Sequence, residues 1–266
     1  MTMFHSVLIP HRDRNDHLGL CLWALDRSAR RCGISDWEVV VVDCGSREKP
    51  SGGGGTMRVI VDPEAPAEFN KSRAYNLAID AARGDVVTFL DADAIVASRF
   101  LDVATVLATD ASVDRCCYRV RYLPGMEAIH IQVAEDRDAY VDELFSEYES
   151  YRKAVEFYGR HDRPDSTVPA NRRQLMQAWG NSQFSVRRAD LAGLRFDEEI
   201  GWGMEDMDFN MQLEARFGDG YRGVIATDSE HAMLHLEHPE RAWREDRRLA
   251  PKIRMYRDNR KRIAGR

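Results

Sequence analysis

Short apolar runs alternate with longer stretches of helical periodicity over the first 110 residues. The runs are rich in β-branched residues and nearly continuous, which is typical of parallel strands buried on both faces. The predicted strands are 7–9, 37–42, 59–61 and 86–90, and the predicted helices are 16–31, 70–82 and 98–107. This alternation predicts an α/β protein with a mostly parallel central sheet flanked by helices, and with ligands at the carboxyl ends of its strands.

The second half of the chain has fewer clear elements. Residues 135–158 carry apolar and aromatic side chains at helical spacing, which favours a core face over a ligand-binding stripe. Another helix is expected from Glu205 to Phe217. We interpret the glycine run at 51–55 as a flexible surface loop rather than a phosphate-binding loop, and residues 160–173 as a mobile loop.

The composition is that of a globular protein without a membrane span. The chain has 266 residues, of which 44% are hydrophobic and 31% charged, enough for one large α/β domain. A mean hydropathy of −0.50 and the lack of a long apolar run exclude a transmembrane helix, and the first residues do not resemble a secretory signal. Five cysteines without a C-x-x-C pair indicate reduced thiols in a cytosolic protein.

Charge is distributed unevenly along the chain. Residues 241–266 hold eleven Lys and Arg against three Asp and Glu, so a net charge of −6 leaves the rest of the chain acidic. We predict a basic C-terminal helix over 239–266. It is either a solvated helix or a contact for an anionic partner such as a lipid headgroup, a polyanionic acceptor or nucleic acid.

Two aspartates follow the fourth predicted strand. Asp91 and Asp93 stand one residue apart where a buried parallel strand ends, at the ligand edge of the sheet. Carboxylate oxygens there suit a hard divalent cation, with Asp93 as direct ligand and Asp91 on a ribose hydroxyl or a metal-bound water. The alternative is that they cap a helix beginning near Ser98.

A second acidic cluster lies at the start of the helix expected from Glu205. Glu205 and Asp206 either cap the helix, whose dipole stabilises carboxylates there, or serve as base and orienting acid. Gly201-Trp202-Gly203 precedes them and could hold a sugar ring against the indole. Further on, His235 and His238 are candidates to supply one nitrogen ligand to the same metal.

Several ordered motifs together resemble those of GT-A glycosyltransferases, between family 2 and the β-1,4-galactosyltransferase family. The resemblance rests on the segments 7–14, 40–46, 69–76, 91–93, 179–182, 196–198 and 201–208, the last reading G-W-G-x-E-D-x-D. It implies a single Rossmann-like GT-A domain over 1–266. Residues 1–93 would bind the nucleotide sugar, and 94–238 would form the acceptor-binding, catalytic half.

The resemblance also implies roles for individual residues. Asp206 would be the general base and Glu205 would orient acceptor hydroxyls. The donor-binding residues it implies are Pro10, Arg12, Arg14, Asp43, Asn70, Lys71 and Asp91. The acceptor-binding residues are Trp202, Gly203, Gly180 and Asn181, and the metal ligands are Asp93 with His235 or His238.

Four positions carry open questions. Cys44 stands where the family has a second aspartate, which leaves the base preference open. Arg12 and Arg14 either contact the nucleotide or are solvated loop charges. Lys71 stands at a helix start, where a cation opposes the dipole, so an anionic partner is expected.

The activity implied by the resemblance is a metal-dependent, inverting glycosyl transfer. A hexose or N-acetylhexosamine would pass from a UDP-sugar to a glycan or glycolipid-type acceptor, with Mn²⁺ or Mg²⁺ as cofactor. The alternatives are a retaining or non-UDP transferase of the same fold, a carbohydrate-binding pseudoenzyme and, last, a nucleic-acid-binding protein. We expect a cytoplasmic protein, with a peripheral position at the inner membrane face left open. The hypothesis requires Asp93 and Asp206 to face one cavity.

Overall fold

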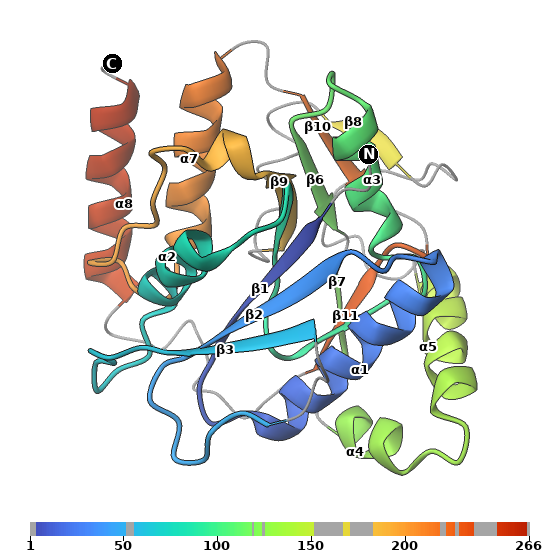
Figure 1. Cartoon of the computed structure of the whole chain (residues 1–266). Coiled ribbons are helices and arrows are strands. Elements are labelled where there is room, and N and C mark those ends of the chain that lie inside the picture. The colour runs from blue at the N-terminus through green and yellow to red at the C-terminus, as the bar shows by residue number, and fades with distance from the viewer. Residues whose placement is uncertain are drawn as a thin grey trace.

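The computed structural model describes most of the chain and shows an α/β protein built on two sheets (Figure 1). The described residues are 4–51, 56–118, 120–123, 126–151, 167–170, 183–218, 222–226, 229–236 and 249–264. Most of the predicted glycine loop and most of the loop expected at 160–173 lie outside them; the described part of the latter, Thr167–Ala170, forms a strand rather than a loop. Among the described residues, no helix combines the length and the apolar character needed to cross a membrane.

The larger sheet has eight strands in the order β3-β2-β1-β4-β9-β6-β10-β8. Its first four strands, all parallel, are β1 (His5–His11), β2 (Trp37–Asp43), β3 (Met57–Val61) and β4 (Val86–Phe89). Its other strands are β6 (Arg115–Tyr118), β8 (Thr167–Ala170), β9 (Phe184–Arg187) and β10 (Gly223–Ala226). β9 runs antiparallel to both β4 and β6, so the second half of the chain continues the sheet of the first.

The smaller sheet has the order β5-β11-β7. Its strands are β5 (Ala94–Val96), β7 (Val120–Leu123) and β11 (Met233–Leu236). The helices are α1 (Asn15–Cys32), α2 (Lys71–Ala81), α3 (Asp102–Thr109), α4 (Met126–Val133), α5 (Arg137–Tyr151), α7 (Glu205–Phe217) and α8 (Leu249–Ala264), with a 3-10 turn η3 (Arg188–Leu191).

Alternation along the central strands builds two cores, one on each face of the sheet. Val7 and Ile9 of β1 pack in the core that contains α1, whereas Leu8 packs in the core that contains α2 and α7 (Figure 1). Side chains along a strand point to opposite faces in turn, so a strand covered on both sides must be apolar throughout. This confirms the predicted α/β class and explains the continuous apolar runs.

Two local predictions were wrong in detail. The strand around Val59 and Val61 is not buried on both faces: these side chains are 38% and 51% exposed, because β3 is the edge strand of the sheet. The helix expected from Ser98 begins only at Asp102, since Phe100 and Leu101 are fully buried in a turn that precedes it. The predicted helix at 135–158 is α5, whose described part ends at Tyr151.

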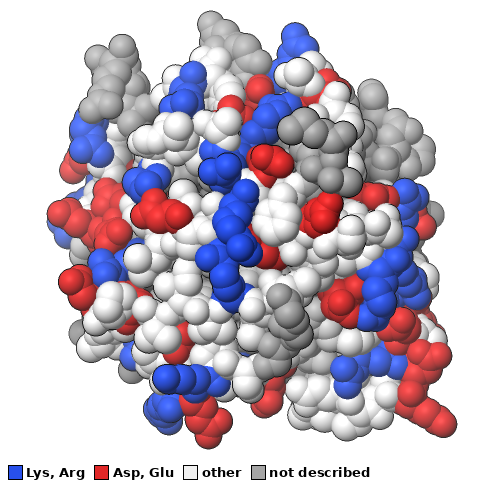
Figure 2. All heavy atoms as spheres, in the orientation of Figure 1, with Lys and Arg blue, Asp and Glu red and all other residues white. Residues whose placement is uncertain are grey.

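The surface carries both signs of charge. Figure 2 shows Lys and Arg side chains interspersed with Asp and Glu over one face of the molecule. On α8, Arg254, Arg257 and Lys261 are exposed, while Tyr256 is buried. Asn259 ties this helix to α7 by donating to Asp208 Oδ1 at 2.8 Å. The described part of the expected C-terminal helix therefore packs on α7 and leaves a basic face outward.

Candidate active site

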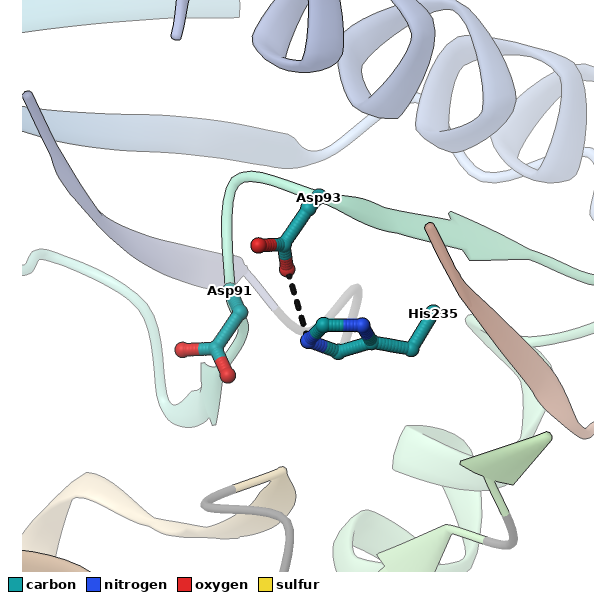
Figure 3. A group of neighbouring side chains, drawn as sticks. All are labelled: Asp91, Asp93 and His235. Atoms are coloured by element: carbon teal, nitrogen blue, oxygen red, sulfur yellow. Dashed lines mark ion pairs between the residues drawn. The ribbon is translucent and has the colours of Figure 1, made fainter. Parts of the chain in front are cut away.

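Three potential metal ligands gather at the end of β4. One ligand atom each from Asp91, Asp93 and His235 lies within 4.8 Å of the others. Figure 3 shows Asp93 and His235 directed toward each other, and their atoms Oδ1 and Nε2 are 3.1 Å apart. Asp93 is 2% exposed and therefore shielded from water. Of the two candidate histidines, His235 is the one that the structure places here; His238 lies outside the described residues.

Backbone pairing sets the position of His235. Ala94, the first residue of β5, is paired with His235 of β11 in an antiparallel ladder. The amide N–H of Leu236 donates to the carbonyl of Asp93 at 2.9 Å, extending that ladder by one residue. A shift of one residue would turn the imidazole to the other side of the sheet. The register of two short strands therefore brings together ligands from distant parts of the chain.

The chemistry of this group fits a divalent cation. Two carboxylates and one imidazole form a mixed oxygen and nitrogen donor set, which suits Mn²⁺ and tolerates Mg²⁺ less well. Arg14 contacts the same group, with its Nη1 atom 2.6 Å from Asp93 Oδ2. The structure thus contains a possible Asp-Asp-His metal site, with a basic side chain beside it.

Lys71 joins this group to the second acidic cluster. Its Nζ atom lies 2.6 Å from Asp91 Oδ1 and 3.6 Å from Glu205 Oε1, and the residue is only 5% exposed. Burial by itself would lower the pKa of Lys71, but the charge of Asp91, with smaller contributions from Tyr75 and Glu205, raises that pKa well above its ordinary value. The anionic partners expected for this cation are the protein's own carboxylates.

Tyr75, one helical turn after Lys71, also contacts Asp91. Its hydroxyl donates to Asp91 Oδ1 at 3.4 Å, and Lys71 Nζ lies 5.7 Å from the centre of its ring. Spacing of four residues places both side chains on one face of α2. Tyr75 was not among the predicted site residues, although its spacing of four residues from Lys71 was a usable signal.

Glu205 and Asp206 are buried where α7 begins. They are 3% and 7% exposed. Burial, and then the negative charge of Glu205, raises the pKa of Asp206 to about 7. The backbone amide of Met207 donates to Asp206 Oδ1 at 2.8 Å and fixes the carboxylate. Asp206 is thus a carboxylate that can gain or lose a proton near neutral pH.

The turn before α7 has an unusual backbone. Gly201, Gly203 and Met204 have positive φ angles of 70°, 83° and 80°. Glycine adopts this region freely, whereas a residue with a Cβ atom is strained in it. The carbonyl of Gly201 accepts from both the amide and the hydroxyl of Ser72, each at 2.9 Å. The turn is therefore fastened to the first turn of α2, next to Lys71.

The other expected donor-binding residues lie near the same end of the sheet. Pro10 is the penultimate residue of β1, and Asp43 ends β2, where it accepts from the amide of Ser46 at 3.1 Å. Arg12 donates to the carbonyl of Pro66 at 3.1 Å. Asn70 caps α2 by accepting from the Arg73 amide at 2.9 Å.

The expected acceptor-binding residues are only partly described. The carbonyl of Trp202 accepts a hydrogen bond from Lys252 of α8, whose Nζ atom lies 5.8 Å from the centre of the indole ring. Gly203 belongs to the turn described above. Gly180 and Asn181 lie outside the described residues.

Gln183 was not among the predicted site residues either. This residue directly precedes β9, is 4% exposed and donates from Nε2 to Asp91 Oδ2 at 3.2 Å. No motif marks it, because its place beside Asp91 depends on the antiparallel pairing of β9 with β4. A cavity of about 540 Å³ lies elsewhere, lined by Asp197, Asp208 and Asn259 among others, and none of the metal-group residues lines it.

Comparison with protein families matches only the N-terminal part of the chain. Residues 6–122 match the model of the family described as Glycosyl transferase family 2. The match includes the Asp43 turn, the start of α2 and the Asp91–Asp93 pair, and it ends before Glu205 and His235. A sequence comparison with curated proteins found no match.

Solved structures resemble the chain over nearly its whole length. S. aureus TarS 1–349 in complex with UDP-GlcNAc is 16% identical, with 97% of this chain and 66% of that chain covered at a TM-score of 0.60. Mannosyltransferase PcManGT from Pyrobaculum calidifontis, in complex with GDP-Man and Mn²⁺, is 16% identical, with coverages of 98% and 65% and a TM-score of 0.58.

A third similar structure is glucosyl-3-phosphoglycerate synthase from Mycobacterium tuberculosis in complex with Mn²⁺, UDP and phosphoglyceric acid. It is 18% identical, with 99% of this chain and 79% of that chain covered at a TM-score of 0.55. The chain therefore has the GT-A fold. It spans 65% of TarS 1–349 and 39% of a longer TarS chain.

Proposed function

We propose that this GT-A protein is a metal-dependent glycosyltransferase that uses a nucleotide sugar as donor. The observation that carries the proposal is the contact of Lys71 with both Asp91 and Glu205. It links the Asp-Asp-His group, suited to a metal-bound diphosphate, with the buried pair Glu205 and Asp206. A transferred sugar has to lie between such a diphosphate and such a base.

The donor side of the site would neutralise the leaving group. Asp93 and His235 would hold the cation, with Asp91 beside them. A cation held there would supply Lewis-acid stabilisation of the negative charge on the leaving diphosphate. Arg14, which contacts Asp93, and Lys71 are the side chains placed to add positive charge there. Pro10, Arg12, Asp43 and Asn70 would line or support the nucleotide side.

The acceptor side would remove a proton from the attacking hydroxyl. Asp206 is the proposed base, because a pKa near 7 lets it be ionised and still accept a proton at neutral pH. Glu205 would orient the acceptor, since its Oε2 atom is buried and has no hydrogen-bond partner among the described residues. Attack from the side opposite the diphosphate inverts the anomeric carbon. Trp202 and Gly203, with Gly180 and Asn181, would complete the acceptor site.

The proposed donor is a UDP-sugar carrying a hexose or N-acetylhexosamine, and the acceptor is of glycan or glycolipid type. Two similar structures contain UDP-GlcNAc or UDP, which favours uridine. A second candidate is a donor with another base: Cys44 replaces a family aspartate and is buried, and PcManGT contains GDP-Man. The proposed division into a donor half, 1–93, and an acceptor half, 94–238, follows the same assignment.

The basic face of α8 belongs to this proposal as a contact for an anionic surface. Arg254, Arg257 and Lys261 are exposed along it. An acceptor carried on a lipid would be presented at such a surface, and a cytoplasmic protein would reach it at the inner membrane face.

A thermal-shift panel tests the proposed function. UDP, GDP and their sugars, including UDP-glucose, UDP-GlcNAc and GDP-mannose, are compared with and without Mn²⁺. We expect stabilisation by one nucleotide only when the metal is present, and metal-dependent hydrolysis of one sugar nucleotide. NMR of the product anomer separates inversion from retention. A protein that shows neither binding nor hydrolysis contradicts the proposal.

A further inference from the structure

The side-chain amide of Gln183 forms a hydrogen bond through its nitrogen but not through its oxygen among the described residues. Its Nε2 atom donates to Asp91 Oδ2 at 3.2 Å, while its Oε1 atom is buried and has no hydrogen-bond partner among the described residues. An ionised carboxylate only accepts hydrogen bonds, so the amide must present its nitrogen to Asp91. The orientation of Gln183 is therefore fixed, and its oxygen is left over.

The unpaired oxygen calls for a ligand with a donor group. A buried carbonyl oxygen without a hydrogen bond is costly, and a ligand that donates to it would remove that cost. Gln183 is 4% exposed, so bulk water does not compensate for the missing partner. The chemistry that fits is an O–H group, which a nucleotide sugar offers both on its ribose and on its transferred sugar.

The position of Gln183 favours the transferred sugar over the ribose. Asp91 belongs to the metal group and is joined through Lys71 to Glu205 on the acceptor side. Gln183 contacts this same Asp91 at Oδ2, while the 2.6 Å contact of Lys71 is with Oδ1. A group beside this bridge lies between the sites proposed for the diphosphate and the base, which is where the sugar must be.

We infer that Gln183 is a specificity-determining residue that accepts a hydrogen bond from a hydroxyl of the donor sugar, an inference that rests on the proposed function. The pairing of β9 with β4 explains why Gln183 lies beside Asp91. Phe184 of β9 is paired with Phe89 of β4, so the residue before Phe184 lies beside the end of β4 that leads to Asp91. The amide nitrogen then donates to Asp91, and the amide oxygen accepts from the sugar hydroxyl.

The test compares nucleotide and nucleotide-sugar affinities for the wild type and Gln183→Met. Affinities for UDP-glucose, UDP-GlcNAc and GDP-mannose are measured by calorimetry with Mn²⁺, each beside its free nucleoside diphosphate. Methionine keeps the length of the side chain but removes both amide atoms. We expect about 5- to 10-fold weaker binding of the preferred sugar nucleotide and less than about 2-fold change for the free diphosphate. Gln212→Met, which removes another amide bonded to a carboxylate, is the matched control.

Sugar analogues give a second measurement, of which the wild-type part does not depend on how the variant folds. Monodeoxy analogues of the preferred sugar nucleotide are bound to the wild type and to Gln183→Met. One deoxy position should weaken wild-type binding about 5- to 10-fold and remove the difference between the two proteins.

Each other outcome overturns the inference. Equal losses for the sugar nucleotide and the free diphosphate would mean that Gln183 acts through Asp91 or the ribose. If the difference between the wild type and Gln183→Met persists with every deoxy analogue, the oxygen of Gln183 accepts no hydrogen bond from a sugar hydroxyl. If the wild type binds a donor and Gln183→Met binds it with the same affinity, this inference alone is overturned. A wild type that binds none of the donors overturns the proposed function as well.

Discussion

Lys71 Nζ lies 2.6 Å from Asp91 Oδ1, so a helix start and a strand end are joined by a buried ion pair. A lysine is unfavourable in the first turn of a helix, because its charge opposes the helix dipole. Here Asp91, and at 3.6 Å Glu205, offset that cost. The pair therefore ties Asp91 of the Asp-Asp-His group to the acid pair at the start of α7.

Replacing Lys71 by methionine should destabilise the protein strongly. The substitution leaves Asp91 and Glu205 without their cation, and loss of one partner of a buried pair typically costs about 3–5 kcal/mol. The midpoint of urea unfolding measures this change. Lys261→Met is the control: Lys261 is 81% exposed in its ion pair with Asp258, and its loss should cost less than about 1 kcal/mol. Similar midpoints for the two variants would contradict a bridging role for Lys71.

Replacing Asp206 by asparagine should abolish turnover without removing donor binding. General bases contribute about 10²- to 10⁴-fold to rate, so a loss of about 10³-fold in kcat is expected while the Kd for the nucleotide stays within about 2-fold. Asp208→Asn provides the control, because Asp208 is also buried in the first turn of α7 but bonds to Asn259 and Gln212. A comparable loss of kcat in Asp206→Asn and Asp208→Asn would contradict the assignment of Asp206 as the general base.

The pH dependence of turnover and that of stability should run in opposite directions. Only ionised Asp206 can accept a proton, so kcat/KM should fall about tenfold per pH unit below about pH 7. For stability, a carboxyl with a raised folded pKa binds its proton more tightly in the folded state than in the unfolded state. Its ionisation therefore destabilises the fold as the pH rises from about 4 to about 7.

Asp206→Asn removes this penalty and should raise Tm more at pH 8 than at pH 5. Each kcal/mol recovered corresponds to about 2–4 °C in a protein of this size. Melting curves of both proteins at the two pH values measure the difference. A Tm gain that does not depend on pH would mean that Asp206 is ionised in the folded protein throughout this range.

Replacing His235 by glutamine should weaken metal binding. The imidazole is the nitrogen donor of the Asp-Asp-His group, and at least about 10-fold weaker Mn²⁺ binding is expected, measured from the EPR signal of free Mn²⁺. His130→Gln is the control, since His130 lies on α4 and pairs with Glu127 at 3.5 Å. Unchanged Mn²⁺ affinity in His235→Gln would show that the cation binds elsewhere.

Local pattern predicted the parallel half of the fold and the aspartates at its edge. The apolar runs of β1, β2 and β4 are buried throughout, so their sequence reflects their environment directly. Asp91 and Asp93 follow such a run, and parallel strands present their carboxyl ends to ligands. These features depend on a few consecutive residues, which is why they could be predicted.

Features that depend on pairing between distant segments were not predicted. The place of His235 beside Asp93 is set by the register of β11 against β5, and the place of Gln183 by the insertion of β9 beside β4. The exposure of β3 follows from its edge position. In each case the deciding contact joins residues far apart in sequence, and a single sequence holds no local signal for it.

Two different kinds of support therefore hold the two sides of the site. His235 and Asp93 keep their spacing through main-chain hydrogen bonds between β5 and β11, which are indifferent to side-chain identity. Glu205 and Asp206 follow a short turn with three left-handed residues, whose shape tolerates few substitutions. A change of residue at 201, 203 or 204 should therefore displace Glu205 and Asp206, whereas in β5 and β11, whose side chains apart from His235 are buried, a change that keeps the packing leaves the spacing of Asp93 and His235 intact.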